Sequence, residues 1–190
     1  MAQPMIRIRP ARPADAPQLA AIYAPYVATG IVSMEESPPG AEEMAARMAA
    51  AGDLYPWLVA TGGDEDTVLG YAYATAFRAR RAYRWAVETT VYVAGDLHRQ
   101  GVGRLLYEAL IDTLRAQRFT QAIAAIALPN DASIGLHESV GFRRAGVYRE
   151  VGWKDGRWVD VGLWQASLAE PETPPVEPRP FSEIGLVREP

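Results

Sequence analysis

The stretch ETTVYVAGDLHRQGVGRLLYEALIDTLRAQ, residues 88–117, decides the fold of this 190-residue chain. Residues 88–93 are rich in β-branched and aromatic side chains, which predicts a strand. Residues 101–117 carry apolar side chains at the i, i+3, i+4, i+7 spacing of an amphipathic helix. A loop punctuated by glycines connects the two. The sequence therefore predicts a strand, a tight loop and a helix in direct succession.

The loop from Gly95 to Arg104 has the composition of an anion-binding site. Glycines let the backbone approach a ligand closely, and the first N–H groups of a helix lack partners within it and favour negative charge. Arg99 and Arg104 add guanidinium groups that suit phosphate. A tight turn without a ligand is the alternative. The motifs G-x-G-x-x-G and G-x-x-x-x-G-K-[ST] are both absent from this loop, which disfavours a nucleoside triphosphate site.

Strand and helix patterns alternate on both sides of this stretch. Since the elements follow one another without a linker, they predict one α/β (α+β) domain with a mixed sheet and flanking helices. The further expected strands are 6–9, 57–61, 68–77, 122–128, 147–153 and 158–167, and the further expected helices are 13–27, 41–51 and 132–140.

The composition changes after Leu168. The following segment contains six prolines, a density that resists both helix and strand pairing. We therefore expect residues 1–168 to form the folded domain and residues 169–190 to be a tail that is disordered or lies extended over the body. Docking of a partner on the tail is the alternative, with four apolar side chains available for it: Phe181, Ile184, Leu186 and Val187.

Composition excludes several classes of protein. The formal net charge of −4 argues against nucleic acid or an anionic membrane as a partner. The chain contains no cysteine and two histidines, so we expect no disulfide, no cysteine nucleophile and no metal site. No apolar run reaches the ~18 residues of a membrane span, and no secretory signal pattern is present. These observations predict a cytoplasmic protein.

Further motifs carry a family resemblance. They are YAYA at 71–74 and FRAR at 77–80, AYRWAVETTVYV at 82–93, LPNDAS at 128–133 with LHE at 136–138, GF at 141–142, and VGWKDGRWVDVGLWQ at 151–165. Together with the loop they resemble the phosphinothricin N-acetyltransferase branch of the GCN5-related N-acetyltransferase (GNAT) superfamily, over residues 5–168. The resemblance implies a mostly antiparallel GNAT-type sheet, acetyl-CoA as co-substrate, and a homodimer with the C-terminal hairpin near its interface.

The resemblance also implies which residues bind acetyl-CoA. The backbone of the strand would pair with the pantetheine arm, the loop amides would hold the pyrophosphate, and Asn130 would contact the arm further along. Asn130 and Ser133 also suit capping of the helix that follows, which is compatible with cofactor contact. His98 stands where the family has Gln or Arg. The expected cofactor-binding residues are Val91, Tyr92, Val93, Arg99, Gln100, Gly101, Val102, Gly103, Arg104, Asn130 and Ser133.

Two residues are candidates for proton transfer. The resemblance implies Glu88 as general base, with His137 as a second candidate. An ammonium must lose its proton before its nitrogen attacks a thioester, and burial raises the pKa of a carboxyl toward the range such a base needs. A structural ion pair is the alternative for Glu88, and a structural or polar lining role is the alternative for His137.

The acceptor is expected to be a small amino-acid-like amine such as phosphinothricin, methionine sulfoximine or methionine sulfone. A guanidinium binds a carboxylate or phosphinate well, which favours Arg78 and Arg80, with Tyr73 and Tyr83 as pocket walls. Met34 stands where relatives are expected to carry an aromatic residue, which suggests a reshaped pocket. Without cysteine, transfer would be direct, in a ternary complex. A protein or peptide N-acetyltransferase and a non-catalytic acyl-CoA sensor are the alternatives.

Overall fold

The computed structural model describes residues 6–62 and 67–187, and within them seven strands form one mixed sheet. Residues 1–5, which open the expected domain 1–168, lie outside this description. The strand order is β1-β2-β3-β4-β5-β7-β6, and each neighbouring pair is antiparallel except β4 and β5. The strands are β1 (Arg7–Pro10), β2 (Trp57–Thr61), β3 (Val68–Ala76), β4 (Ala86–Val93), β5 (Gln121–Leu128), β6 (Arg143–Lys154) and β7 (Arg157–Ser167).

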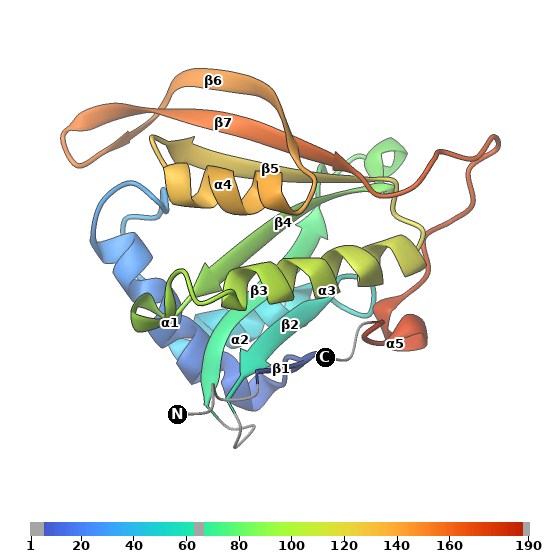
Figure 1. The fold of residues 1–190 in the computed structure, drawn as a ribbon, viewed down its shortest axis with the longest axis horizontal. Helices are drawn as coiled ribbons and strands as arrows, with labels where there is room; N and C mark the ends of the chain where they lie inside the picture. Colours follow the sequence, from blue (N-terminus) through green and yellow to red (C-terminus); the bar gives the residue numbers. More distant parts are fainter. Residues whose placement is uncertain (1–5, 63–66, 188–190) are drawn as a thin grey trace.

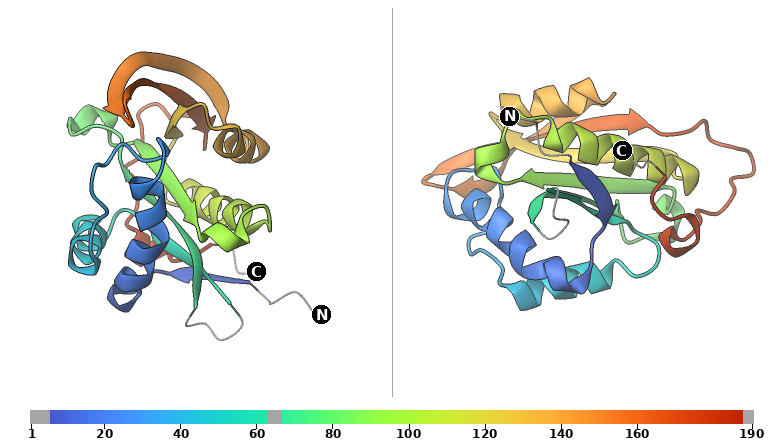
Figure 2. Two further views of the ribbon diagram at one scale, coloured as in Figure 1. Left: turned by 90° about the vertical axis from the view of Figure 1, so that its left-hand side faces the viewer. Right: turned by 60° about the horizontal axis from the view of Figure 1, so that its bottom comes forward.

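Helices cover both faces of this sheet (Figures 1 and 2). One face carries α1 (Ala16–Ala28) and α2 (Ala41–Ala50), and the other carries α3 (Val102–Ala116) and α4 (Asp131–Ser139). Two buried clusters result, since each face of the sheet packs apolar side chains against its own helices. Leu106, Leu110 and Phe119 belong to the cluster under α3. The mixed, mostly antiparallel single-domain fold predicted from sequence is confirmed.

The parallel pair β4 and β5 separates along its length. Their backbone register runs from Ala86 opposite Gln121 to Glu88 opposite Ile123 and goes no further. Figure 1 shows the two strands side by side at one end and spread apart at the other. On its other edge β4 stays paired with β3 as far as Val93. The second half of β4 therefore has an edge toward β5 whose backbone groups are outside the sheet ladder.

The elements agree with the predicted patterns apart from their ends. Strand β6 begins at Arg143 rather than at 147, because its first residues already pair with β7 opposite Gln165. Helix α3 begins at Val102, after Gly101 with a φ of 86°. Among the described residues, no helix is long and apolar enough to cross a membrane.

The described part of the C-terminal segment lies along the body. The indole nitrogen of Trp85 donates to the carbonyl of Val176 at 2.8 Å, and Arg84 pairs with Glu177. The amide of buried Gln117 donates to the carbonyl of Arg179 at 2.9 Å. One helical turn, α5 (Phe181–Ile184), begins directly after Pro180, which differs from the expectation that prolines keep helix out of this segment. Its four residues contain no proline, so nothing prevents the turn.

Candidate active site

A groove of about 1000 Å³ opens where β4 and β5 separate. Its walls come from the end of β4, the loop before α3, the start of α4 and two positions near α1. The lining residues are Tyr26, Val32, Val91, Tyr92, Val93, Leu97, His98, Arg99, Gly101, Val102, Gly103, Arg104, Asn130, Asp131, Ala132, Ser133 and Leu136. Every residue predicted to bind the cofactor is among them except Gln100.

Two helix N-termini meet at this groove. Helix α3 contributes Val102 and Gly103 from its first turn, and α4 contributes residues 131–133. The side-chain oxygen of Asn130 accepts a hydrogen bond from the backbone N–H of Ser133 at 3.1 Å, which caps α4. The first N–H groups of each helix have no acceptor within it, and both helix dipoles place partial positive charge here. The arrangement suits an elongated ligand that carries phosphate.

The loop before α3 reaches this position through two left-handed residues. Arg99 has a φ of 64° and Gly101 a φ of 86°. Glycine adopts this conformation without strain, whereas arginine adopts it at some cost. Gln100 lies between them and outside the groove lining. A side chain at position 103 would have little room, because a Cβ added to Gly103 would lie 3.1 Å from Cδ2 of Leu136.

His98 is tied to the end of β4 through Tyr26. The hydroxyl of Tyr26 donates to the carbonyl of Val93 at 2.5 Å and lies 2.6 Å from Nε2 of His98. Since a hydroxyl has one hydrogen, Nε2–H of His98 donates to Tyr26. Burial raises the pKa of Tyr26, which keeps it protonated. Tyr26 and Val32 lie far from the loop in sequence, and no local motif identifies them as groove residues.

Glu88 lies at the point where β4 and β5 stop pairing. Its side chain is half-buried, and burial raises the pKa of its carboxyl, while the charge of Arg78 partly opposes this. The residues that the structure describes form no salt bridge with Glu88, so the structural ion pair considered as its alternative is absent among them. Glu88 precedes groove residue Val91 by three positions, about 10 Å along an extended strand. A half-desolvated carboxyl therefore stands near the groove without lining it.

His137 is part of the core between α3 and α4, with 4% of its surface exposed. Its Nδ1 lies 2.7 Å from the carbonyl oxygen of Ser133, so this nitrogen carries a hydrogen and donates it. In the neutral ring Nε2 then accepts from the hydroxyl of Tyr107 at 2.7 Å. Burial lowers the pKa of His137, which favours this neutral form. Both ring nitrogens are occupied, and His137 does not line the groove.

The predicted acceptor residues lie outside the groove lining. Arg78 places its guanidinium 4.3 Å from the ring centroid of Phe77, and Tyr83 meets the same ring edge-on at 5.9 Å. Arg80 is exposed directly before the 3₁₀ turn at 81–83. These residues cluster before the start of β4, where Arg78 influences Glu88.

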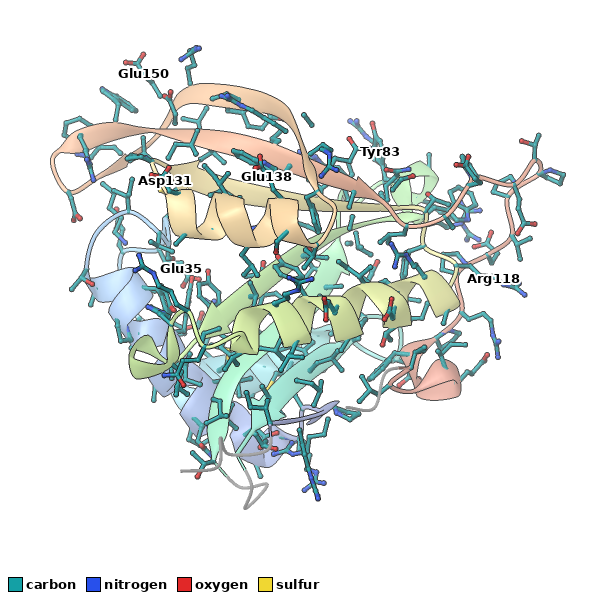
Figure 3. All side chains as sticks on the ribbon, in the orientation of Figure 1. Glu35, Tyr83, Arg118, Asp131, Glu138 and Glu150 are labelled. Carbon is teal, nitrogen blue, oxygen red and sulfur yellow. The ribbon has the colours of Figure 1, made fainter. Side chains whose placement is uncertain are left out.

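The other two acceptor candidates come from different places. Tyr73 is half-buried on β3 and stacks on Trp57 with ring centroids 4.1 Å apart. Met34 is 37% exposed in the loop between α1 and α2. Figure 3 shows Glu35, its neighbour in sequence, far from Tyr83 across the molecule. The acceptor candidates therefore come from β3, from the segment between β3 and β4, and from the loop between α1 and α2.

Across residues 6–62 and 67–187, no group of three or more histidine, aspartate or glutamate side chains is arranged to hold a metal ion.

Comparisons with known proteins agree on one family. Residues 8–163 match the sequence profile of the acetyltransferase (GNAT) domain. The chain is 41% identical to the phosphinothricin N-acetyltransferase of Streptomyces viridochromogenes over 94% of this chain and 96% of that protein. It is 40% identical to the L-methionine sulfoximine/L-methionine sulfone acetyltransferase of Pseudomonas paraeruginosa over 85% of this chain and 94% of that protein.

A solved structure shares the fold in detail. The crystal structure of a GNAT superfamily phosphinothricin acetyltransferase from Sinorhizobium meliloti, in complex with acetyl-CoA, superimposes with a TM-score of 0.84. The two chains are 37% identical, and the match covers 91% of this chain and 92% of that one.

Proposed function

Because the chain belongs to the GNAT family of N-acetyltransferases, we propose that it transfers the acetyl group of acetyl-CoA to the α-amine of a small amino-acid-like acceptor. Phosphinothricin, methionine sulfoximine and methionine sulfone are the proposed acceptors, in keeping with the names of its relatives. The observation that carries the proposal is the groove at the separation of β4 and β5, where two helix N-termini meet the free edge of a strand.

The groove residues suit acetyl-CoA in charge and shape. The first-turn amides of α3, with Arg99 and Arg104, would hold the pyrophosphate, since helix N-termini and guanidinium groups both bind phosphate oxygens. The edge of β4 from Val91 to Val93 lies outside the ladder with β5 and offers backbone N–H and C=O groups to the amides of the pantetheine arm, apart from the carbonyl of Val93, which accepts from Tyr26. Asn130, which caps α4, lies on the opposite wall. The bound co-substrate would supply the thioester.

Glu88 is the proposed general base. The amine must be unprotonated when it attacks, and a carboxyl with a raised pKa accepts a proton more readily than an ordinary one. Its position, short of the groove lining, suits transfer through a bound water. A backbone N–H of the Val91–Val93 segment would stabilise the oxyanion that forms on the carbonyl oxygen of the thioester when the amine attacks the carbonyl carbon. The chain has no cysteine, so the acetyl group would pass directly to the amine, without an acyl-cysteine.

His137 would serve this site by positioning rather than by touching the acceptor. Its two hydrogen bonds fix Tyr107 of α3 and Ser133 of α4, and Ser133 lines the groove. On the acceptor side, Arg78 and Arg80 are proposed to meet the carboxylate. Tyr73, Tyr83 and Met34 are proposed as walls.

A panel of amines tests the proposal against its two rivals. Free thiol released from acetyl-CoA would be followed with amino acids, polyamines and peptides that have a free N-terminus. We expect turnover with phosphinothricin, methionine sulfoximine or methionine sulfone and much less with peptides. Preference for peptides would favour the protein N-acetyltransferase, and acetyl-CoA binding without turnover on any amine would favour the sensor.

We also propose that the protein is a homodimer that uses the β6–β7 hairpin. Trp153 and Trp158 are 58% and 60% exposed and pack edge to face, and Tyr148 and Val151 on β6 are exposed beside them. An exposed apolar patch of this kind is typical of an interface. Sedimentation of the wild type and of Trp158→Glu would test it, with dissociation expected for the variant. The proposed compartment is the cytoplasm, where acetyl-CoA is available.

A further inference from the structure

One ammonium group connects the C-terminal hairpin to the loop between α1 and α2. Lys154 is the last residue of β6 and comes directly before the turn that joins β6 to β7. Its Nζ donates to the carbonyl oxygens of Val27 at 2.7 Å, Ser33 at 2.7 Å and Glu35 at 2.8 Å. An ammonium group has three N–H donors, so these contacts use all of its donors.

The loop depends on such a donor because it has no regular structure of its own. Residues 29–36 form neither helix nor strand. Apart from Lys154, the backbone N–H of Ser33 donates to the carbonyl of Tyr26 of α1 at a long 3.3 Å, and that of Glu35 donates to Oγ of Ser33 at 3.1 Å. Hydrogen bonds from a charged donor are shorter and stronger than neutral ones, so Lys154 provides a large share of what fixes this loop.

The side chains of the loop face functional parts of the molecule. Val32 lines the groove, and Met34 packs against Gly152 of β6. A Cβ on Gly152 would lie 2.2 Å from Cε of Met34, so the methionine fills space that a glycine leaves open. Strand β6 therefore contacts the loop twice: through the ammonium group of Lys154, and through Gly152, against which Met34 packs.

The other side of the loop is fixed from α1 and α2. The carboxylate of Glu35 accepts two hydrogen bonds from Arg47 at 2.7 and 2.8 Å and one from the hydroxyl of Tyr23 at 2.8 Å. These contacts, together with nearby Lys154, lower the pKa of Glu35 and keep it charged. The contacts of Glu35 thus join the loop to α1 and α2, and Lys154 joins it to the β6–β7 hairpin.

We propose that Lys154 is a positioning residue that sets the acceptor affinity of the enzyme by holding residues 29–36 against the hairpin. The inference rests on the proposed function, in which Met34 belongs to the acceptor side. Without Lys154 three carbonyl groups lose their donor, and the acceptor must order the loop when it binds. Glu88 and the amides of α3 lie on other elements, so the chemical step is left intact once the acceptor is bound.

Lys154→Met tests this, because methionine keeps an unbranched apolar stem and removes the ammonium. We expect the KM for the acceptor to rise about 10-fold, as three charge-assisted hydrogen bonds are lost, with kcat little changed and a smaller rise in the KM for acetyl-CoA, because Val32 of the same loop lines the groove. Lys154→Arg should recover part of the acceptor affinity. Arg157→Met is the matched control. Arg157 lies opposite Lys154 in the hairpin register and is exposed, and its substitution by methionine removes the same charge. A wild-type acceptor KM in Lys154→Met would overturn the proposal.

Amide hydrogen exchange gives a readout that does not depend on turnover. In Lys154→Met we expect faster exchange in residues 26–36 and unchanged exchange in α3, whereas Arg157→Met should match the wild type. Faster exchange throughout the chain would mean a general loss of stability and would overturn the positioning role. If the wild type acetylates no amine, the proposed function fails, and the exchange data still decide whether Lys154 holds the loop.

Discussion

Replacing His137 by alanine tests whether this histidine has a structural role or acts on the reacting atoms. The substitution removes two hydrogen bonds of 2.7 Å and leaves the carbonyl of Ser133 and the hydroxyl of Tyr107 without their partner. It also removes ring contacts with Tyr107 and Phe142, whose centroids lie 4.8 and 5.3 Å from the imidazole. We therefore expect a large loss of stability and a small loss of kcat.

The size of the loss follows from these contacts. One buried polar group left without a partner costs about 1–3 kcal/mol. Each aromatic contact contributes roughly 0.5–1.5 kcal/mol beyond burial. The free energy of unfolding should fall by at least about 3–4 kcal/mol, which lowers Tm by roughly 10 °C or more in a domain of this size. Ordinary domains have about 5–15 kcal/mol in total, so the variant should still fold.

The pH dependence of the free energy of unfolding gives an independent test of the structural role of His137. Burial lowers the pKa of His137 below its ordinary 6.5. Above pH 6.5 neither the folded nor the unfolded chain binds a proton at this ring, so His137 makes its full contribution to stability. As the pH falls below 6.5, the unfolded chain takes up the proton and the folded chain does not, so stability declines by about 1.4 kcal/mol per pH unit until the folded pKa is reached. His137→Ala should lose this component of the slope.

Urea unfolding at about pH 8 and about pH 5.5, with kcat measured at the higher pH, makes the test. His98→Ala is the matched control, because His98 is the other histidine and is exposed on the loop before α3. The control should lose much less stability, because it removes a single hydrogen bond, to Tyr26, from an exposed side chain. Wild-type stability in His137→Ala together with a thousandfold loss of kcat, about the size of a lost general acid or base, would refute the structural role.

Three further substitutions test other parts of the site. In Glu88→Gln we expect kcat to fall about 10²–10⁴-fold. Burial raises the pKa of Glu88, so we expect kcat/KM of the wild type to rise with pH above 4.5, and we expect Glu88→Gln to lose this component of the profile. An unchanged pH profile would exclude Glu88 as the base. Gly103→Ala should remain close to the wild type, because its Cβ lies 3.1 Å from Cδ2 of Leu136 and the end of that side chain can move by a few tenths of an ångström. Gly103→Val adds two methyl groups beyond this Cβ and should raise the KM for acetyl-CoA about 10-fold. Truncation after Leu168 should cost about 3 kcal/mol of unfolding free energy, because Phe181 and Leu186 pack on the core and Gln117 loses a hydrogen bond; an unchanged urea midpoint would show that the segment contributes nothing.

The sequence predicts the local parts of this site well. Strand β4, its loop and α3 follow from residue spacing and glycine placement within 30 consecutive residues, 88–117. Capping of α4 by Asn130 follows from its place before the helix. In each case the interactions that determine the structure lie between near neighbours in the chain.

Other parts depend on contacts between distant segments. The separation of β4 and β5 beyond Glu88 creates the groove, and no residue pattern in either strand announces it. Tyr26 of α1 and Val32 in the following loop line the groove, and since they are far from its other residues in sequence, no local pattern predicts this. Gln100 is excluded by backbone turns on either side of it. Lys154 has no motif of its own, and its three carbonyl partners come together only in the folded chain.

One assay tests the proposed reaction most directly: initial rates with acetyl-CoA and phosphinothricin, in which free thiol and N-acetylated product are both quantified. We predict that thiol and N-acetylphosphinothricin form in equal amounts, that neither forms when one substrate is omitted, and that rates measured against both substrates give the intersecting pattern of a ternary complex. Tight binding of acetyl-CoA with no acetylated product from phosphinothricin, methionine sulfoximine or methionine sulfone would contradict it.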